Sequence, residues 1–494
     1  MLPTVRLYNT MSRTVEVLQP RVPGVVGLYV CGMTVYDYTH IGHSRAMMAF
    51  DVIVRHLRHR GYAVTFVRNH TDVDDKVIAR AAVLGVDPLT LSAGFITALE
   101  EDLRALGMVS PDVTPKVTDH VDGIVDLITA LIDRGHAYLA ENQDVYFAVE
   151  SDPEYGKLSN KNLEDQRAGE RVAVEAAKRH PADFALWKAH GGHASEPSWP
   201  SPWGPGRPGW HIECSAMSRR HLGDCFDIHG GGIDLIFPHH ENEIAQSECG
   251  TGQRPMARYW MHNGHLTMDQ VKMSKSLGNI VRIRDILEQV PAEALRLFYL
   301  ETHYRAPIPY SSDRLVESLK ALDRIYSAKE TVEFASGDTD AAELGEAAEE
   351  AWRLGLAFPD RFYAAMDEDF NAAGAMGHLF ELVRAVNRFG NDKKVRSRGG
   401  KALAPAKAAF ALVAAVLGVA TMTPAAFFDE VKLMRLAAAG RSAADIDALV
   451  DARTAARAAK DWARADALRL ELDAQNIVVM DGQAGSTWRM RIDG

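Results

Sequence analysis

The chain has 494 residues, of which 47% are hydrophobic and 24% charged, and its formal net charge is −11. These values are typical of a soluble globular enzyme of about three domains, and the negative balance argues against non-specific adhesion to nucleic acid. Four cysteines do not make a disulfide framework, and no basic segment followed by an apolar stretch marks a secretory signal, so we expect a cytoplasmic protein.

The N-terminal part of the chain is predicted to form a βαβ unit. Residues 25–30 are apolar and suit a buried strand, and apolar side chains recur at helical spacing over 46–57 before Gly61 stops the helix. Residues 63–67 give the next strand. Such a unit implies a parallel sheet with a right-handed crossover, whose ligands bind beyond the carboxyl ends of the strands, at a helix N-terminus. The tetrapeptide 40–43, His-Ile-Gly-His, lies at that point.

The remaining segments divide the chain further. Strand-like runs resume at 226–228 and 259–261. The apolar run 408–422 is too short to cross a bilayer, and we expect a buried bundle helix and no membrane. The predicted fold class is α/β: a Rossmann-like parallel-sheet domain with an insertion, then an α-helical bundle and a small C-terminal domain. The expected boundaries are 1–110 and 209–282 for the two halves of the sheet domain, 111–208 for the insertion, 283–428 for the bundle and 429–494 for the C-terminal module.

Two short motifs contain residues that can bind a triphosphate. The loop 40–43 puts two histidines beside a glycine, and 272–276, Lys-Met-Ser-Lys-Ser, puts two lysines in a polar loop. In this order they resemble the HIGH and KMSKS motifs of class I aminoacyl-tRNA synthetases. The resemblance implies that Gly42 lets adenine approach the backbone, that the histidines donate to phosphate oxygens and that the lysines neutralise the departing phosphates. The implied catalytic residues are His40, His43, Lys272 and Lys275.

A third set of residues suits a metal ion. Cys31 ends the first strand, Cys214 lies far along the chain, and His239 and Glu243 share one face of a helix that we expect over 238–250. Thiolate, imidazole and carboxylate donors suit zinc. The spacing alone is not specific, because the two cysteines form no compact pair. Buried structural cysteines and a solvated His–Glu pair are the alternative.

Four longer runs carry a more specific resemblance. Residues 31–37, 69–76, 209–217 and 229–243 are similar to the cysteinyl-tRNA synthetases, in the order of that family and across essentially the whole chain. The resemblance implies one zinc ion per chain in the amino-acid pocket. Its implied ligands are Cys31, Cys214, His239 and Glu243.

The resemblance also assigns residues to the substrates. Residues 230–232 with Asp234 are similar to the family's adenosine strip, although an ordinary strand-to-loop turn is the alternative. The residues implied for ATP are Gly42, Gly230, Gly231, Gly232, Asp234 and Lys275. Those implied for the cysteine pocket are Gly32, Thr71 and Trp210, and a plain core position is the alternative for Trp210.

The C-terminal module supplies the argument for tRNA. A basic helix is expected over 443–472, with arginines and lysines at three- or four-residue spacing. The segment resembles the family's anticodon-binding domain, and a solvated helix with ion pairs is the alternative. The implied anticodon-reading residues are Arg457, Asp466 and Asp481.

The resemblance implies that L-cysteine is activated by ATP, with magnesium on the triphosphate. Cysteine is then transferred to the terminal adenosine of tRNA(Cys), and the enzyme is expected to be a monomer.

Three alternatives remain open. A cysteine:aminosugar ligase of mycothiol synthesis shares the adenylation core but lacks the anticodon module. A nucleotidyltransferase of the same fold shares only the His-x-Gly-His loop. A non-catalytic tRNA-binding paralogue would have lost a motif histidine or Lys275, and none is lost.

Overall fold

The computed structural model describes residues 2–161, 177–192, 196–268, 271–272, 280–392, 395–482 and 485–491. The chain divides into two compact units. The first comprises Met1–Leu266, Tyr304–Pro307 and Asp367–Phe370, and the second comprises Thr267–His303, Ile308–Met366 and Asn371–Gly494.

Four parallel strands form the central sheet of the first unit. Their order is β10 (Ala257–Asn263), β9 (Phe226–Gly232), β3 (Val25–Val30) and β4 (Ala63–Arg68). The chain runs from β3 to β4 on one side and later returns to β9 and β10 on the other, so the strand order reverses between β3 and β9. Open α/β sheets bind ligands at such a reversal. The predicted parallel sheet and its four strands are confirmed.

Helix α1 (Ile41–His59) joins β3 to β4 and begins well before the apolar repeat that predicted it. His40 is its N-cap: the imidazole Nδ1 accepts hydrogen bonds from the backbone N–H groups of Gly42, at 3.1 Å, and His43, at 3.3 Å. The cap satisfies donors that the first helical turn leaves without partners. Because histidine is not a preferred capping residue, the sequence pattern does not reveal this helix start.

The insertion folds into a helix and a small sheet in the first unit. It contains the short 3-10 turns Val117–Asp119 and Val149–Ser151, and helix α4 (Val121–Asp133). Its four antiparallel strands are, in order, β5 (Ala137–Leu139), β6 (Val145–Phe147), β7 (Phe184–Ala189) and β8 (Gly206–Pro208). The other elements of this unit are the hairpin β1 (Arg6–Asn9) and β2 (Thr14–Val17), and the helices α2 (Asp75–Leu84), α3 (Pro88–Ala105), α6 (Trp210–Leu222) and α7 (Glu241–Thr251).

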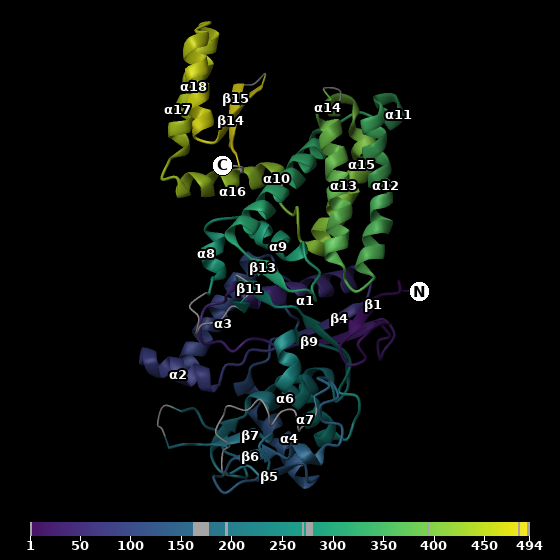
Figure 1. Cartoon of the computed structure of the whole chain (residues 1–494), viewed down its shortest axis with the longest axis vertical. Helices are drawn as coiled ribbons and strands as arrows, with labels where there is room; N and C mark the ends of the chain where they lie inside the picture. Colours follow the sequence, from purple (N-terminus) through teal and green to yellow (C-terminus); the bar gives the residue numbers. More distant parts are fainter. Residues whose placement is uncertain are drawn as a thin grey trace. The chain divides into compact units, whose positions relative to one another are not determined.

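One hydrophobic core holds the insertion to the second half of the sheet domain. Buried side chains of α4, β6 and β7 pack with those of α6 and α7, whose ribbons gather around the small sheet in Figure 1. The helix predicted over 238–250 differs at both ends. A π-turn, Ile236–His240, precedes α7, and Gly252, with a positive φ of 73°, ends it. Gly250 lies inside α7 rather than at its end. The lack of a side chain there lets α7 pack closely on α4, because a Cβ on residue 250 would be 2.6 Å from the Cδ1 of Leu127.

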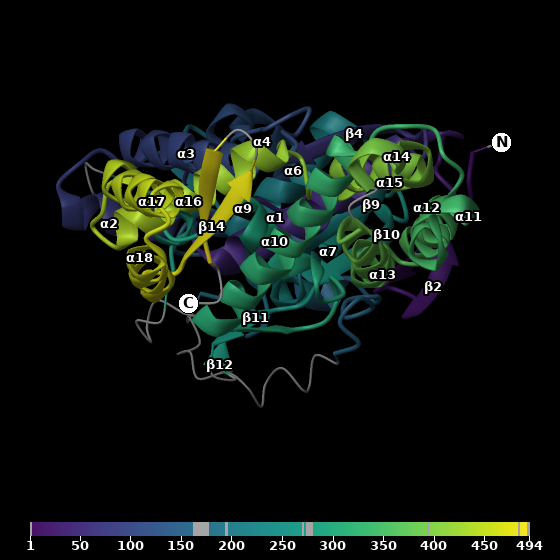
Figure 2. The same cartoon turned by 90° about the horizontal axis from the view of Figure 1, so that it is seen from above.

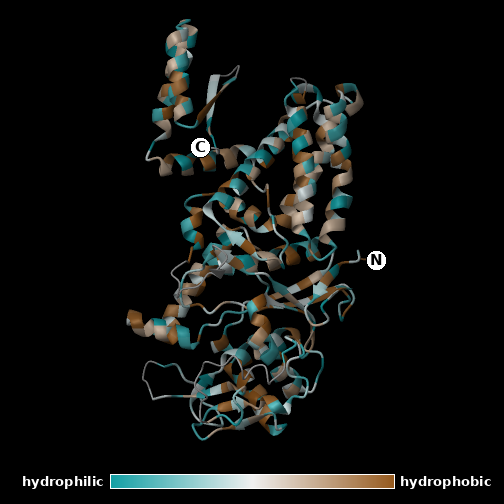
Figure 3. Cartoon of the chain, viewed as in Figure 1, coloured by the Kyte–Doolittle hydropathy of each residue, from teal (hydrophilic) through white to brown (hydrophobic). Residues whose placement is uncertain are grey.

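The second unit is mainly helical. Helices α12 (Glu346–Met366), α13 (Ala372–Gly390) and α15 (Gly400–Leu417) run side by side, and α10 (Ser312–Phe334) packs on the last two (Figures 1 and 2). Each carries hydrophobic and hydrophilic residues in turn, as Figure 3 shows, because one face is buried in the bundle. Shorter elements are α8 (Ile283–Leu287), α9 (Ala292–Leu300), α11 (Ala341–Leu344), α14 (Val395–Arg398) and the sheet of β12 (Val271–Lys272), β11 (Leu266–Met268) and β13 (Ile308–Tyr310).

Helix α15 corresponds to the apolar run of the sequence. Among the described residues it is long and apolar enough to cross a membrane by length and composition, and half of it is buried inside the protein. Its buried residues pack against α12, α13 and α10, as expected for a core helix of a bundle.

The C-terminal module has its own small core. It contains α16 (Pro424–Ala438), α17 (Ala443–Ala458), α18 (Trp462–Ala474) and the hairpin β14 (Ile477–Gly482) and β15 (Gly485–Met490). The single helix predicted over 443–472 is wrong: α17 and α18 are separate helices that pack on each other. Lys460 adopts a positive φ of 58° at the break. The basic residues of this segment therefore do not share one helix face.

Candidate amino-acid and metal site

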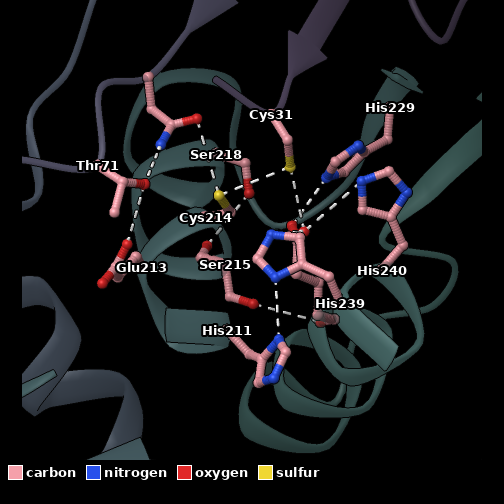
Figure 4. A network of polar contacts seen from close by, with 12 residues as sticks. Cys31, Thr71, His211, Glu213, Cys214, Ser215, Ser218, His229, His239 and His240 are labelled. Atoms are coloured by element: carbon pink, nitrogen blue, oxygen red, sulfur yellow. Dashed lines mark hydrogen bonds and ion pairs between the residues drawn. The ribbon is translucent and has the colours of Figure 1, made fainter. Parts of the chain in front are cut away.

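Four segments of the first unit bring two thiols, an imidazole and a carboxylate together (Figure 4). Cys31 directly follows β3, Cys214 lies on α6, His239 in the π-turn and Glu243 in the first turn of α7. The Sγ of Cys31 is 3.6 Å from the Sγ of Cys214 and 3.3 Å from the Oε1 of Glu243. The Nε2 of His239 is 3.0 Å from the same Oε1.

The donor set and its burial fit a cation. One donor atom from each of the four residues lies within 4.8 Å of all the others. Glu243 is fully buried, Cys214 and His239 are 2% exposed, Cys31 is half-buried, and both cysteines are free thiols. Two sulfur atoms, a nitrogen and an oxygen form a mixed set that zinc accepts. The predicted ligand residues are thus one compact group, although the two cysteines are far apart in the sequence.

Two of the four groups are already deprotonated, as metal ligands must be. A hydrogen bond from the Cys31 thiol lowers the pKa of Cys214 to about 6, whereas burial raises the pKa of Cys31 well above its usual value. Burial alone would lower the pKa of His239, but Glu243 and Cys214 raise it to about 10. Burial alone would raise the pKa of Glu243, but the neighbouring His229 and His239 hold it well below its usual value. A thiolate on Cys214 and a carboxylate on Glu243 are therefore present near neutral pH, whereas Cys31 and His239 hold protons that a bound cation would displace.

Sequence reasoning missed the histidines that surround this group. The Nε2 of His229, on β9, is 2.8 Å from the Oε2 of Glu243. The Nε2 of His240 is 4.0 Å from the Oε1 of Glu243, and its Nδ1 is 2.8 Å from the Nε2 of His262 on β10. Cys31, His229, His240 and Glu243 form a second donor group of the same size. The sequence does not show that these rings are neighbours, because they converge from two strands, β9 and β10, and from the π-turn.

Trp210 and His211 close one side of the group. The Trp210 ring stacks on the His239 ring, with centroids 4.3 Å apart and planes at 22°. The Nδ1 of His211 is 2.9 Å from the Nδ1 of His239. Trp210 is 38% exposed, so it is not a core residue. Both side chains also line a cavity of about 680 Å³ with residues of α2 and β7, a volume in the usual range of small-molecule sites.

The other two residues predicted for the cysteine pocket, Gly32 and Thr71, lie beside Cys214. The Oδ1 of Asn69 accepts a hydrogen bond from the N–H of Gly32 at 2.8 Å and is 3.8 Å from the Sγ of Cys214. The Nδ2 of Asn69 donates to the Oγ1 of Thr71 at 3.3 Å. A Cβ on Gly32 would lie 1.7 Å from the backbone oxygen of Asn69, so only glycine fits at this strand end.

The two motif histidines lie together at the start of α1. The rings of His40 and His43 stack with centroids 3.6 Å apart. Because the Nδ1 of His40 accepts hydrogen bonds from the backbone, the proton of a neutral ring is on Nε2, which is then a donor. This position, beyond β3 and next to the reversal of strand order, is the one predicted for the nucleotide loop.

The glycine run that ends β9 has a packing explanation of its own. A Cβ on Gly230 would lie 2.2 Å from the Phe50 ring, and one on Gly231 would lie 2.8 Å from the His240 ring. Asp234 follows in an exposed 3-10 turn, Ile233–Leu235. Packing thus accounts for the first two glycines, and a ribose contact for Asp234 stays a prediction.

The lysine loop and the anticodon residues belong to the second unit. Lys272 ends β12, and Lys275 lies outside the described residues. Arg457, on α17, forms an ion pair with Asp481 on β14, and Arg453 contacts the same carboxylate through both of its terminal nitrogens at 2.9 and 3.1 Å. The hydrogen bond from Arg453 is the main reason that the pKa of Asp481 is well below its usual value. Asp466 is exposed on α18.

Comparison with known proteins identifies the class. Residues 17–320 match the family described as tRNA synthetases class I (C) catalytic domain, 361–421 match the DALR domain, and 441–489 match the cysteinyl-tRNA ligase anticodon binding domain. The fold is similar to that of methionyl-tRNA synthetase from Mycobacterium tuberculosis in complex with methionyl-adenylate. The TM-score is 0.60 at 16% identity, over 80% of this chain and 92% of that one. The parallel sheet is that of the class I aminoacyl-tRNA synthetase fold.

Full-length relatives define the family within that class. A cysteine–tRNA ligase from Alkalilimnicola ehrlichii is 50% identical over 487 residues, which cover 98% of this chain and 99% of that protein. One from Geobacter sulfurreducens is 49% identical, covering 99% and 100%. The chain therefore belongs to the cysteine–tRNA ligases, as its motifs predicted. The match includes the anticodon-binding module, so the aminosugar ligase alternative is not favoured.

Proposed function

We propose that the chain activates L-cysteine with ATP to cysteinyl-adenylate and pyrophosphate, and then transfers cysteine to the terminal adenosine of tRNA(Cys). We further propose that Cys31, Cys214, His239 and Glu243 hold one zinc ion. The observation that supports this most strongly is the buried group of two sulfur atoms, one nitrogen and one oxygen at the reversal of strand order.

The donor atoms of this group suit the selection of cysteine over serine. Cysteine and serine differ by one atom, and a shape difference of that size gives about 10–200-fold discrimination in a pocket. When bound, zinc would favour the substrate thiolate over a hydroxyl, since it is a good partner for sulfur. Trp210 stacks on His239 and restricts its ring, so the imidazole is held in one orientation toward the pocket. We therefore propose selection before the chemical step, with no editing domain.

The adenylation step uses residues at the start of α1. The carboxylate of cysteine attacks the α-phosphorus of ATP in line, and the negative charge that develops on the phosphate oxygens needs preorganised donors. His40 is oriented by its own backbone cap, so its Nε2–H can donate to such an oxygen without reorganisation. Lys275 and Lys272 would neutralise the leaving pyrophosphate. Magnesium enters with the triphosphate as part of the substrate.

The remaining site residues are proposed for the substrates. The backbones of Gly42 and Gly230–Gly232 would contact the adenosine, with Asp234 accepting from a ribose hydroxyl. Arg457, Asp466 and Asp481 would read the anticodon, and the ion pair holds the side chain of Arg457, on α17, against that of Asp481, on β14.

Pyrophosphate exchange tests this proposal directly. The purified protein is assayed for ATP–pyrophosphate exchange with each of the twenty amino acids, before and after dialysis against a zinc chelator. We expect exchange with cysteine alone, loss of exchange after chelation, and recovery when zinc is added back. Exchange with another amino acid would refute the cysteine assignment. Full cysteine-dependent exchange by metal-free protein would refute the zinc assignment.

A further inference from the structure

Three buried polar side chains form a hydrogen-bonded chain beside the candidate metal site, and we name Asn69, Thr71 and Glu213 the polar clamp. Each is 1% exposed. The Oγ1 of Thr71 donates to the Oε2 of Glu213 at 3.3 Å, and the Nδ2 of Asn69 donates to the Oγ1 of Thr71 at 3.3 Å. Figure 4 shows Thr71 pointing toward Glu213 on one side of the two cysteines.

One backbone group fixes the orientation of the Asn69 amide. The N–H of Gly32 can only donate, so the atom of Asn69 at 2.8 Å from it must be the carbonyl oxygen. The amide nitrogen of Asn69 then faces Thr71, and the Thr71 hydroxyl must accept from it. The Thr71 hydroxyl in turn donates its hydrogen to the Oε2 of Glu213. One lone pair of the Thr71 oxygen remains, so toward any further partner this hydroxyl can only accept.

Stability alone does not explain Glu213. Its neighbours on α6, Ile212, Ala216 and Met217, are buried and apolar. Within the described residues Glu213 has no ion pair, and a buried carboxyl group with one hydrogen bond costs free energy relative to an apolar side chain. The clamp also joins the ends of β3 and β4 to the start of α6, the segments that carry Cys31, Thr71 and Cys214.

We propose that Glu213 and Asn69 are positioning residues for the amino-acid substrate: they orient the Thr71 hydroxyl so that its free lone pair accepts a hydrogen bond from the α-ammonium group. This inference rests on the proposed function, in which Thr71 lines the cysteine pocket. The clamp thereby separates two recognition tasks. The substrate thiolate is bound at the group of Cys31, Cys214, His239 and Glu243. The substrate ammonium group is bound by Thr71.

Two substitutions at one position test the clamp. Glu213→Ala removes the acceptor for the Thr71 hydroxyl, and Glu213→Gln keeps an acceptor oxygen at the same distance. In ATP–pyrophosphate exchange, we expect Glu213→Ala to raise KM for cysteine about tenfold and to change kcat by less than about threefold, the pattern of lost ground-state binding. Glu213→Gln should stay within about twofold of the parent. Ser218→Ala is the matched control, because Ser218 is buried on the same helix and its hydroxyl donates to the backbone oxygen of Ser215, also on α6.

An analogue separates the ammonium contact from the rest of the pocket. The inhibitor 3-mercaptopropionate keeps the thiol and carboxylate of cysteine but lacks the ammonium group. Its inhibition constant should be the same for the parent, Glu213→Ala and Glu213→Gln, with zinc content unchanged in all three. Equal weakening of cysteine and of the analogue would overturn the inference, and so would an unchanged KM for cysteine in Glu213→Ala. If the parent enzyme itself shows no cysteine-dependent exchange, the proposed function fails instead.

Discussion

His70 is a buried histidine with a specific effect on stability. It follows β4 and is 1% exposed, and neither ring nitrogen has a hydrogen-bond partner among the described residues. The Oε1 of Glu100, a half-exposed side chain on α3, is 3.6 Å from the Nε2 of His70, too far for a hydrogen bond. Burial, with smaller contributions from Arg68 and Lys116, lowers the pKa of His70 from 6.5 to about 4.

The sign of the pH effect follows from this lowered pKa. In the unfolded chain His70 binds a proton below about pH 6.5, whereas in the folded chain it binds one only near pH 4. The folded state therefore keeps its full stability above pH 6.5 and loses stability as the pH falls toward 4. Linkage gives a loss of about 2 kcal/mol between about pH 7.5 and about pH 5. His70→Leu should remove this loss. It should also gain about 1–3 kcal/mol near neutral pH, because two unpaired buried nitrogens disappear.

Pulse proteolysis in urea measures the effect, since fragments identified by mass report the unfolding of the first unit separately from the second. The free energies of unfolding of the parent and of His70→Leu are compared at both pH values. His59→Leu is the control, because His59 is exposed at the end of α1 and should alter the pH dependence far less. If His70→Leu lost as much stability on acidification as the parent, the argument from burial would be wrong.

Three further predictions concern the proposed functions. The parent should bind about one zinc per chain by elemental analysis, and the Cys31→Ser, Cys214→Ser double variant should bind almost none; full occupancy would exclude the proposed ligand set. Lys275→Ala should slow pyrophosphate exchange about 10²–10³-fold with tRNA affinity unchanged, and a parental exchange rate would show that the loop is misassigned. Arg457→Ala should weaken tRNA(Cys) binding by about 1–3 kcal/mol in filter binding while exchange continues, and unaltered binding would contradict its anticodon role.

The sequence alone was sufficient for features that short segments encode. Short apolar runs located β3 and β4, and apolar residues at helical spacing located the body of α1. Such patterns are visible within a few residues of sequence. The two triphosphate motifs and the four long runs identified the family, which the full-length relatives confirm. Helix ends were less certain. The capping role of His40 and the break at Lys460 depend on local backbone geometry that residue preferences describe poorly.

Only the tertiary structure could show the site as a set of atoms. Cys31 and Cys214 come within 3.6 Å because the strand order reverses between β3 and β9, and this reversal brings an early strand end against a late helix. The same convergence puts His229 against Glu243 and builds the polar clamp from two distant segments. Such contacts depend on how strands are ordered in the sheet. No periodicity along the chain records that order, because it is set by packing between segments far apart in the sequence.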